Sequence, residues 1–501
     1  MTSQTLLLAE PELRFGFGQN SADPKEGLFL FGPIRDSVNP LRLRVGVIGT
    51  PHGIALYRKW VNRISRAIPA PADTRTSVFY PGFRELFSCD WPLEPEIAVA
   101  LSASEISSKL RIAERHEAVY ETVGLFSDAI SKSLVEDETR PDLWYVVIPD
   151  EVYQFARPKS FVPTAERIKS ETKMNSRLAR RLQREPSLFD DDMLAAEPFF
   201  FDLDFRNQLK ARLISKAAVT QIVRESTLQA DDRPSGSKRR LQDSATVAWN
   251  LSVSTFYKAG GKPWRLASVR DGVCYVGLVF KKDMTGPTDV NACCGAQMFL
   301  TNGDGMVFKG RLGPWYSAKT GEFHLSRELA NDIARGVAAA YIAQTGTAPR
   351  EVFFHGKTRF NADEWSGFVE GLPESTCVVG VRITRSDEFK LFRPGRMPVI
   401  RGTAIVDSAR MGYLWTTGYV PDLGTYPGWE TPNPLRIEIC HGSADIKVVL
   451  ADVLQLTKLN FNACIYGDGL PVTLRFADAV GEILTAAPDL PDAPLPFRNY
   501  I

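Results

Sequence analysis

Two cations spaced four residues apart, followed by an amide, form the most distinctive polar pattern in the sequence. Arg206 and Lys210 stand in "DFRNQLKARLISK", which predicts a helix with both side chains on one face. Gln221 follows in "AVTQIV", which predicts a strand. Taken alone, two cations at this spacing are more typical of a solvated helix face. The amide that follows them raises a second hypothesis, a wall that binds an anion.

A third cation lies further along the chain, directly before a Gly-containing turn. Lys258 follows the apolar segment "AWNLSVSTFY" and precedes "AGGKPW". Its local pattern favours a tight turn between helix and strand over a phosphate-binding loop. A terminal phosphate needs converging cations and neutral donors, and each charge-assisted bond contributes roughly 1.5–3 kcal/mol. Arg206, Lys210, Gln221 and Lys258 supply such donors, so together they predict a pocket for a 5′-phosphate.

The sequence contains none of the common hydrolase or nucleotide-binding motifs. Gly-x-Ser-x-Gly, the Gly-x-x-x-x-Gly-Lys-Ser/Thr loop and a paired-histidine motif are absent. The seven cysteines include no Cys-x-x-Cys pair, and the five histidines complete no zinc spacing. Most cysteines stand in apolar runs, so we expect buried thiols in a reducing compartment.

Composition is that of an ordinary folded protein. The 501 residues are enough for two or three domains, and 44% of them are hydrophobic. At a net charge of +1, a nucleic-acid binder must concentrate its basic residues locally. The N-terminus lacks a basic region typical of signal peptides, and no stretch approaches 18 apolar residues. We expect a cytoplasmic protein without a membrane span.

The first half of the sequence alternates apolar strands with helices. Strands are predicted in "LRLRVGVIGT" (41–50) and "DLWYVVIPDEV" (142–152). Helices are predicted in "HGIALYRKWVNRISRAI" (52–68) and "HEAVYETVGLFSDAISKSL" (116–134). This alternation predicts an α/β layer built on a parallel sheet.

Two polar segments interrupt this pattern. The segment 169–192, "KSETKMNSRLARRLQREPSLFDDD", is basic and then acidic. It is typical of a solvated helix or loop, although a strip that faces phosphates or a partner remains an alternative. The segment 229–244, "QADDRPSGSKRRLQDS", combines Pro, Ser and Gly and is the best internal domain boundary.

After this boundary the order of elements changes. Three strands, "GVCYVGLVFKK", "NACCGAQMFLTN" and "MVFKGRLG", are followed by helix, strand, helix and strand over 326–385. Two late helices, "ADIKVVLADVLQLTKLN" and "VTLRFADAVGEILTA", close the chain. This is the order of a ribonuclease H-like domain.

A nuclease of that fold needs three or four carboxylates to hold two divalent metals. The first is expected in the middle of the first strand, where this chain has Val279. Another is expected at the end of "EVFFHGK", around Gly356. Asp478 fits either a last metal ligand or an ordinary helix acid, and one acid cannot hold two metals. We therefore expect no hydrolysis.

The basic set resembles the guide 5′-phosphate pocket of Argonaute MID domains. In that family a variable first residue, a Lys four positions later, a Gln and then a Lys before a small-Gly-Gly turn bind the phosphate. The resemblance assigns these roles to Arg206, Lys210, Gln221 and Lys258. Many Argonautes have a further Lys where this chain has Ser254, which implies a less basic pocket or one filled by a metal ion.

The second half resembles a PIWI domain, including "LTKLNFN" and "PVTLRFAD". In this family the C-terminal carboxylate reaches back to the MID pocket and helps to bind magnesium. The resemblance gives that role to Ile501, since an anionic group can join a phosphate only through a cation such as Mg²⁺.

Length and motifs resemble short prokaryotic Argonautes, especially those that partner a TIR–APAZ protein. The segments of this sequence that carry the resemblance include "DPKEGLFLFGP", "VAWNLSVSTFYKAGGKPWRL" and "NACCGAQMFLTNGDGMVFKG". The resemblance implies a guide RNA that detects invading single-stranded DNA and activates NAD⁺ hydrolysis by the partner. It also implies a heterodimer that assembles into larger oligomers on activation. Sirtuin-like or nuclease APAZ effectors remain alternatives.

We therefore expect an N-terminal segment with a Rossmann-like MID domain over 1–240 and a catalytically inactive, ribonuclease H-like PIWI domain over 241–501. Two other functions stay open on the residues alone. The chain could be an active guide-directed nuclease with displaced acids, or a structural subunit that binds nucleic acid without specificity.

Overall fold

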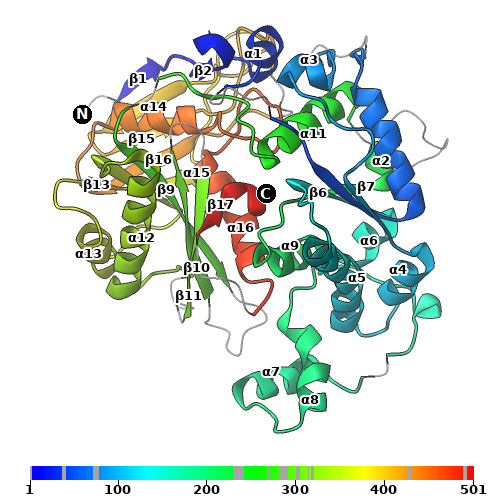
Figure 1. Cartoon of the computed structure of the whole chain (residues 1–501). Helices are drawn as coiled ribbons and strands as arrows, with labels where there is room; N and C mark the ends of the chain where they lie inside the picture. Colours follow the sequence, from blue (N-terminus) through cyan, green and yellow to red (C-terminus); the bar gives the residue numbers. More distant parts are fainter. Residues whose placement is uncertain are drawn as a thin grey trace.

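The computed structural model places two β-sheets side by side, each covered by helices (Figure 1). In the described part of the chain, no helix is both long and apolar enough to cross a membrane. The predicted boundary segment, 229–244, lies largely outside the described residues. The structure describes residues 3–35, 41–71, 78–170, 172–229, 242–268, 270–282, 292–300, 305–313, 315–316, 321–426, 428, 430–488 and 494–501.

The first sheet has four parallel strands in the order β5-β4-β6-β7. Every residue of β4 and β6 is buried, because helices cover both faces of the sheet. The predicted parallel α/β layer is confirmed. The strands are β4 (Val45–Gly49), β5 (Ile97–Ala100), β6 (Leu143–Ile148) and β7 (Thr220–Arg224).

We call the four-stranded sheet with its helices the first lobe, and the ten-stranded sheet with its helices the second lobe. The helices of the first lobe divide between the two faces of the four-stranded sheet. One face packs against α5 and α9 through residues such as Phe126, Phe205 and Leu209. The other packs against α2 and α11, and the Tyr145 and Thr255 hydroxyls share a short hydrogen bond there. The helices are α2 (Pro51–Ile64), α3 (Phe83–Phe87), α4 (Ala103–Leu110), α5 (Arg115–Glu136), α6 (Asp150–Phe155), α9 (Phe205–Ile214), α10 (Glu225–Leu228) and α11 (Ser244–Lys258).

The second sheet has ten strands in the order β1-β14-β15-β16-β13-β12-β9-β10-β11-β17. β9, β10 and β11 are antiparallel neighbours, whereas β12 pairs in parallel with both β9 and β13. This agrees with the predicted ribonuclease H-like order. The strands are β1 (Gln4–Leu7), β9 (Val273–Lys282), β10 (Ala292–Phe299), β11 (Gly305–Gly313), β12 (Glu351–Gly356), β13 (Cys377–Arg385), β14 (Thr403–Ser408), β15 (Met411–Leu414), β16 (Leu435–His441) and β17 (Leu495–Pro496).

Two groups of helices cover this sheet, one on each face. α12 (Arg327–Thr345) and α13 (Ala362–Glu370) pack on one face. α14 (Ile446–Leu456) and the last helices pack on the other. The late helix predicted over "VTLRFADAVGEILTA" is instead two, α15 (Val472–Arg475) and α16 (Ala477–Leu484), because Phe476 between them leaves helical geometry at φ −105° and ψ 1°.

The basic segment that follows residue 168 forms a small helical projection at the end of the first lobe (Figure 1). α7 (Ser176–Arg184) and α8 (Asp190–Ala196) pack on η3 (Glu197–Phe200) through Ala179, Ala196 and Phe199. The solvated helix predicted here is confirmed, since the arginines of α7 are exposed. A role in contacting phosphates or a partner stays a prediction.

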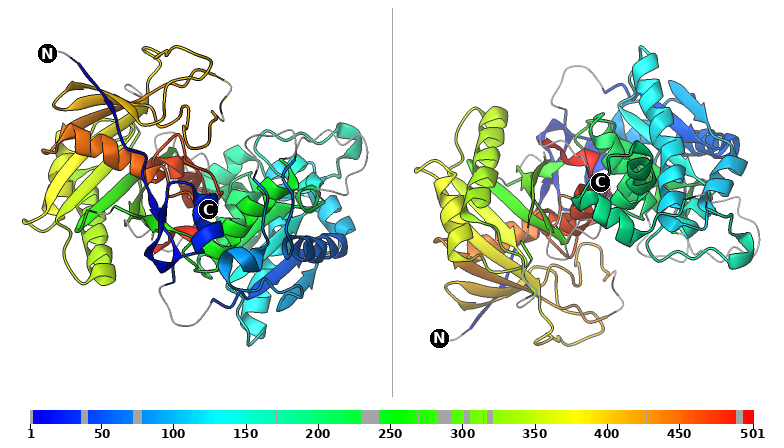
Figure 2. Two further views of the ribbon diagram at one scale, coloured as in Figure 1. Left: turned by 90° about the horizontal axis from the view of Figure 1, so that it is seen from above. Right: turned by 90° about the horizontal axis from the view of Figure 1, so that it is seen from below.

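Residues near both termini pack into the large core that the two lobes share. Near the N-terminus, α1 (Pro24–Phe31) follows a small sheet of β2 (Leu13–Arg14), β3 (Asn20–Ser21) and β8 (Arg265–Leu266). β1 lies further away, as the edge of the ten-stranded sheet. The C-terminus lies near the middle of the molecule in both views of Figure 2.

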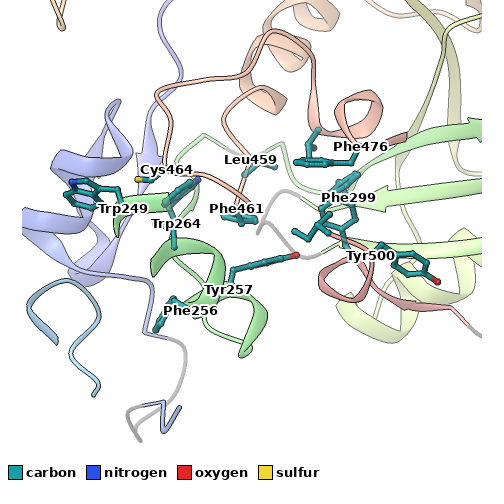
Figure 3. Close-up of a cluster of buried hydrophobic side chains, with 14 of the residues drawn as sticks. Trp249, Phe256, Tyr257, Trp264, Phe299, Leu459, Phe461, Cys464, Phe476 and Tyr500 are labelled. Atoms are coloured by element: carbon teal, nitrogen blue, oxygen red, sulfur yellow. The ribbon is translucent and has the colours of Figure 1, made fainter. Parts of the chain in front are cut away.

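Aromatic side chains from the two lobes share one core (Figure 3). Tyr257 of α11 stacks on Phe461 with ring centroids 4.6 Å apart, and Trp264 contacts the same ring at 5.3 Å. Phe299 of β10 meets Phe497 at 5.0 Å. α11 follows the predicted boundary at residue 240, yet its other side contacts the four-stranded sheet. The helix is therefore a wall common to both lobes.

The described cysteines differ in burial. Cys89, Cys274 and Cys464 are buried, as expected. Cys377 is exposed and Cys440 partly exposed, so the prediction of buried thiols is wrong for these two. Cys377 is the first residue of β13, where the strand emerges at the edge of the packed core.

Candidate functional site

The structure brings all five residues of the predicted pocket together. Arg206 and Lys210 come from α9, Gln221 from β7, Lys258 from the end of α11 and Ile501 from the end of the chain. All five line one cavity of about 460 Å³. Positions that span almost three hundred residues therefore form one site, although its ligand stays a prediction.

Helix α9 begins at a capped end that fixes its first turn. The Asp204 carboxylate accepts hydrogen bonds from the backbone N–H groups of Arg206 at 3.0 Å and Asn207 at 3.2 Å. Phe205 and Leu209 pack into the core beneath the helix. This packing turns the neighbouring face, which lies about 100° further round the helix and carries the two cations, toward Tyr500 and Ile501.

Lys210 lies at the base of the cavity and is only 3% exposed. Its ammonium group donates to the main-chain oxygen of Ile501 at 2.8 Å. It also donates to the main-chain and side-chain oxygens of Thr220, each at 3.2 Å. Three donors meet three neutral or main-chain oxygens, which keeps the buried group satisfied.

Lys258 approaches from the other side and orients the amide of Gln221. Its ammonium group donates to Gln221 Oε1 at 2.7 Å and to the Thr220 main-chain oxygen at 3.2 Å. The Ser254 hydroxyl donates to the same Gln221 oxygen at 3.0 Å. Because the amide oxygen accepts from both, the amide nitrogen is the group that Gln221 can offer to a ligand.

Arg206 contacts the chain's penultimate residue. Its guanidinium donates to the Tyr500 main-chain oxygen and to Asn207 Oδ1, both at 3.2 Å. Tyr500 and Ile501 are each 3% exposed and pack into the shared core. The last two residues are therefore held by the same helix face that carries the two cations.

Burial makes this cluster of cations electrostatically strained. Desolvation, with a smaller contribution from the charge of Arg206, lowers the pKa of Lys258 to about 7. Burial and the charges of Lys258 and Arg206 lower the pKa of Lys210 well below its ordinary value. Among the described residues, none of the three cations forms an ion pair with an acidic side chain. An anion in the cavity would relieve this repulsion.

An exposed tyrosine lines the cavity, with two arginines close to its ring. Tyr153 of α6 is 44% exposed, with the Arg224 guanidinium 3.9 Å and that of Arg157 4.6 Å from its ring centroid. All three residues line the cavity. No sequence pattern singled out these three residues, although an aromatic residue shortly after the buried strand β6 was an available signal.

The expected nuclease positions hold no cluster of metal ligands among the described residues. Gly356 ends β12, and Val279 lies in β9 with a side chain outside the described part. Asp478 of α16 forms an ion pair with Lys357, whose ammonium lies 2.9 Å from one carboxylate oxygen. A lysine therefore takes up the charge of the acid that was considered as a metal ligand.

Sequence comparison finds no matching family model and no matching curated protein. Solved structures do match in fold. One is Clostridium butyricum Argonaute bound to a guide DNA and a 19-mer target DNA, with a TM-score of 0.63 and 14% sequence identity. The alignment covers 97% of this chain and 54% of the Argonaute chain.

Two further structures match similarly. A. aeolicus Argonaute has a TM-score of 0.55 and 12% identity, covering 98% of this chain and 55% of its own. Drosophila Piwi has a TM-score of 0.57 and 12% identity, with coverages of 96% and 54%. The chain spans about half the length of the structures that it matches. The likeness shows that this chain has an α/β fold similar to the MID–PIWI fold of Argonaute proteins.

Proposed function

We propose that this chain binds the phosphorylated 5′ end of a guide RNA and uses the guide to detect single-stranded DNA of invading plasmids or phages. One observation carries the proposal: two buried lysines and a half-buried arginine converge in one cavity, and among the described residues none of them forms an ion pair with an acidic side chain. A terminal phosphate carries about −1.5 to −2 charges at neutral pH and supplies three strong acceptor oxygens. It therefore matches the cavity in both charge and hydrogen-bonding character.

Each side chain has a distinct part in this proposal. Lys210 and Lys258 supply charge from the base of the cavity, and Arg206 supplies it from the rim. The amide nitrogen of Gln221 donates to a phosphate oxygen. The exposed ring of Tyr153 offers a surface on which the first base can stack. Sequence would then be read by base pairing between guide and target, while the protein contacts backbone and shape.

Magnesium at the phosphate belongs to this proposal. The main-chain oxygen of Ile501 already faces the cavity, where it accepts from Lys210. Oxygen donors of this kind fit Mg²⁺, which commonly binds one or two carboxylates together with phosphate oxygens. A terminal carboxylate at Ile501 would hold the ion. Bound there, magnesium would offset the repulsion between that carboxylate and the guide phosphate.

We further propose that the chain detects its target without cutting it. The absence of a side chain at Gly356 and the ion pair of Asp478 with Lys357 support this. Its output would come from a separate APAZ-containing effector in a heterodimer. This effector would be a TIR–APAZ protein that hydrolyses NAD⁺, giving an abortive-infection type of defence. Sirtuin-like and nuclease effectors are the alternatives, and larger oligomers would form on activation.

Guide strands that differ only at the 5′ end test the central claim. The purified chain should bind a 5′-phosphorylated RNA more tightly than the same RNA with a 5′-hydroxyl. Lys210→Ala and Gln221→Ala should both reduce this preference. Equal affinities for the two strands would refute the pocket assignment and favour a subunit that binds nucleic acid without specificity.

A cleavage assay separates the sensor from an active nuclease. With a matched guide and target, and with Mg²⁺ or Mn²⁺, the target should stay intact over many hours. Sustained cutting would contradict the proposal. Adding candidate effectors then identifies the output, because only the true partner should show activity, such as NAD⁺ loss, that depends on both guide and target.

A further inference from the structure

Two lysines stand at the carboxyl ends of neighbouring parallel strands in the ten-stranded sheet. Lys281 lies near the end of β9, and Lys357 directly follows β12. The ammonium group of Lys281 lies 3.1 Å from Glu482, and that of Lys357 lies 2.9 Å from Asp478. Both carboxylates belong to α16. One helix therefore holds a lysine from each of two strands.

Register places the two lysines on one face of the sheet. β9 and β12 pair in parallel, with Gly277 opposite His355. Lys281 and Lys357 lie an even number of residues beyond these two positions, so their side chains point to the face that carries α15 and α16. Asp478 and Glu482 are four residues apart on α16, hence one helical turn apart on the same side. The two ion pairs therefore lie one helical turn apart along α16.

These ion pairs are partly open to solvent. The side chains are 34% exposed at Lys281, 41% at Glu482, 51% at Lys357 and 70% at Asp478. Solvent-exposed ion pairs contribute little to stability and are weakened by salt. A phosphate of a nucleic-acid backbone, whose charges follow closely one after another along the strand, can therefore replace the carboxylate at low cost, and the sheet continues to position the lysine.

The ion pair of Lys281 with Glu482 lies next to the pocket proposed for the 5′ end. Lys281 and Glu482 line a cavity of about 1130 Å³ that shares Tyr153, Arg157 and Asp204 with the smaller one. The charge of Glu482 also acts on Arg206, whose pKa it tends to raise against the larger effect of burial. A strand that leaves the pocket thus has a continuous hollow leading to Lys281.

We propose that Lys281 and Lys357 form a binding site for the phosphodiester backbone of the nucleic acid, in which Glu482 and Asp478 are stand-in anions that phosphates displace. The inference rests on the proposed function. The residues present do not fit a pair of divalent metals, because ammonium groups already neutralise the two carboxylates. The site would therefore bind a backbone in the region where an active nuclease of this element order would hold its two metals.

Neutralising the two lysines tests whether they bind the backbone. Lys281→Gln, Lys357→Gln and the double variant should each weaken binding of a guide–target duplex, and the slope of log affinity against log salt should become shallower by about one per lysine. Lys132→Gln is the matched control, since Lys132 is an exposed lysine paired with Glu136 on α5. Affinities and slopes equal to those of this control would overturn the proposal.

Neutralising the acids tests the exchange. Glu482→Gln and Asp478→Asn remove a competitor for each lysine, so duplex affinity should rise about threefold to tenfold, whereas Glu136→Gln should leave it unchanged. Unchanged or weaker binding in both acid variants would show that the carboxylates are not displaced. Thermal melting of each variant checks that the fold is intact, as expected for exposed side chains.

The two proposals fail in distinguishable ways. Loss of the preference for a 5′-phosphate in the wild-type chain would refute the proposed pocket, and the lysine variants can still be judged with a 5′-hydroxyl duplex. Normal 5′-phosphate preference combined with unchanged salt slopes in the lysine variants would refute only the backbone site.

Discussion

Lys210 donates a hydrogen bond of 2.8 Å to the main-chain oxygen of Ile501, which lies 291 positions later in the sequence. This contact makes the end of the chain part of the cavity wall. It also supplies a hydrogen-bond acceptor to a buried ammonium group that no acidic side chain pairs with in the described part of the chain. A phosphate that enters the cavity would meet a cation that is already fixed in position.

Replacing Lys210 should reduce the advantage of a 5′-phosphate. Lys210→Met keeps an apolar stem but removes the charge, and a lost charge-assisted bond of roughly 1.5–3 kcal/mol corresponds to about a tenfold to hundredfold weaker binding. Affinities for phosphorylated and hydroxyl guides measure the effect. Lys216→Met, at an exposed lysine beyond the end of α9, is the control and should bind as the wild type does.

Guide binding should depend on pH through Lys258. Its pKa of about 7 should rise when a phosphate binds, so binding takes up a proton above neutral pH. Affinity should be highest between about pH 6, where the phosphate loses its second proton, and pH 7, and should then fall by up to tenfold per unit.

An arginine at the same position provides the control for this pH dependence. Lys258→Arg keeps its charge throughout this range, so its affinity should vary much less above pH 7. Titrations of a 5′-phosphorylated guide between about pH 6 and 9 supply the measurement. A flat profile for the wild-type chain would count against Lys258 as a phosphate ligand.

Removing magnesium should weaken only the phosphorylated guide. If the ion joins the carboxylate of Ile501 to the phosphate, chelation by EDTA leaves two anionic groups facing each other. The affinity of the 5′-phosphorylated strand should then drop toward that of the 5′-hydroxyl strand, which should itself change little. Equal losses for both strands would point to a general effect of the ion on nucleic acid.

Replacing Tyr153 should affect the first base and leave phosphate recognition in place. Tyr153→Ala should weaken guide binding about fivefold to hundredfold, since stacking of one base contributes roughly 1–3 kcal/mol. Tyr153→Phe keeps the ring and should bind normally. An abasic first nucleotide should make the wild type and Tyr153→Ala bind alike, and a persistent difference would exclude stacking.

The predictable parts of this protein are those that local patterns determine. The continuous apolar runs of β4 and β6 indicated a buried parallel sheet, and the spacing of Arg206 and Lys210 indicated a shared helix face. Ser326 and Gly346, residue types that favour the start and the end of a helix, stand at the two ends of α12, where a side-chain cap and a left-handed residue are observed. Each of these features depends on residues within a few turns of one another.

Features that depend on distant contacts were not predictable in this way. β14 and β15 lie in a long connection whose polar and apolar residues show no clear period, and pairing with neighbouring strands decides their conformation. The role of Tyr153 depends on Arg157 and Arg224 reaching the same ring. The pairing of Lys357 with Asp478 joins residues 121 positions apart, which no local pattern reveals.

The position of α11 connects the cavity to the contact between the two lobes. Lys258 faces the cavity, while its neighbour Tyr257 stacks on Phe461 in the core that the two lobes share. A ligand that fixes Lys258 therefore also fixes the seam between the lobes. Free energy from occupying one small cavity would be distributed over the whole chain, so that a loaded molecule melts as a single cooperative unit at a higher temperature than the empty one.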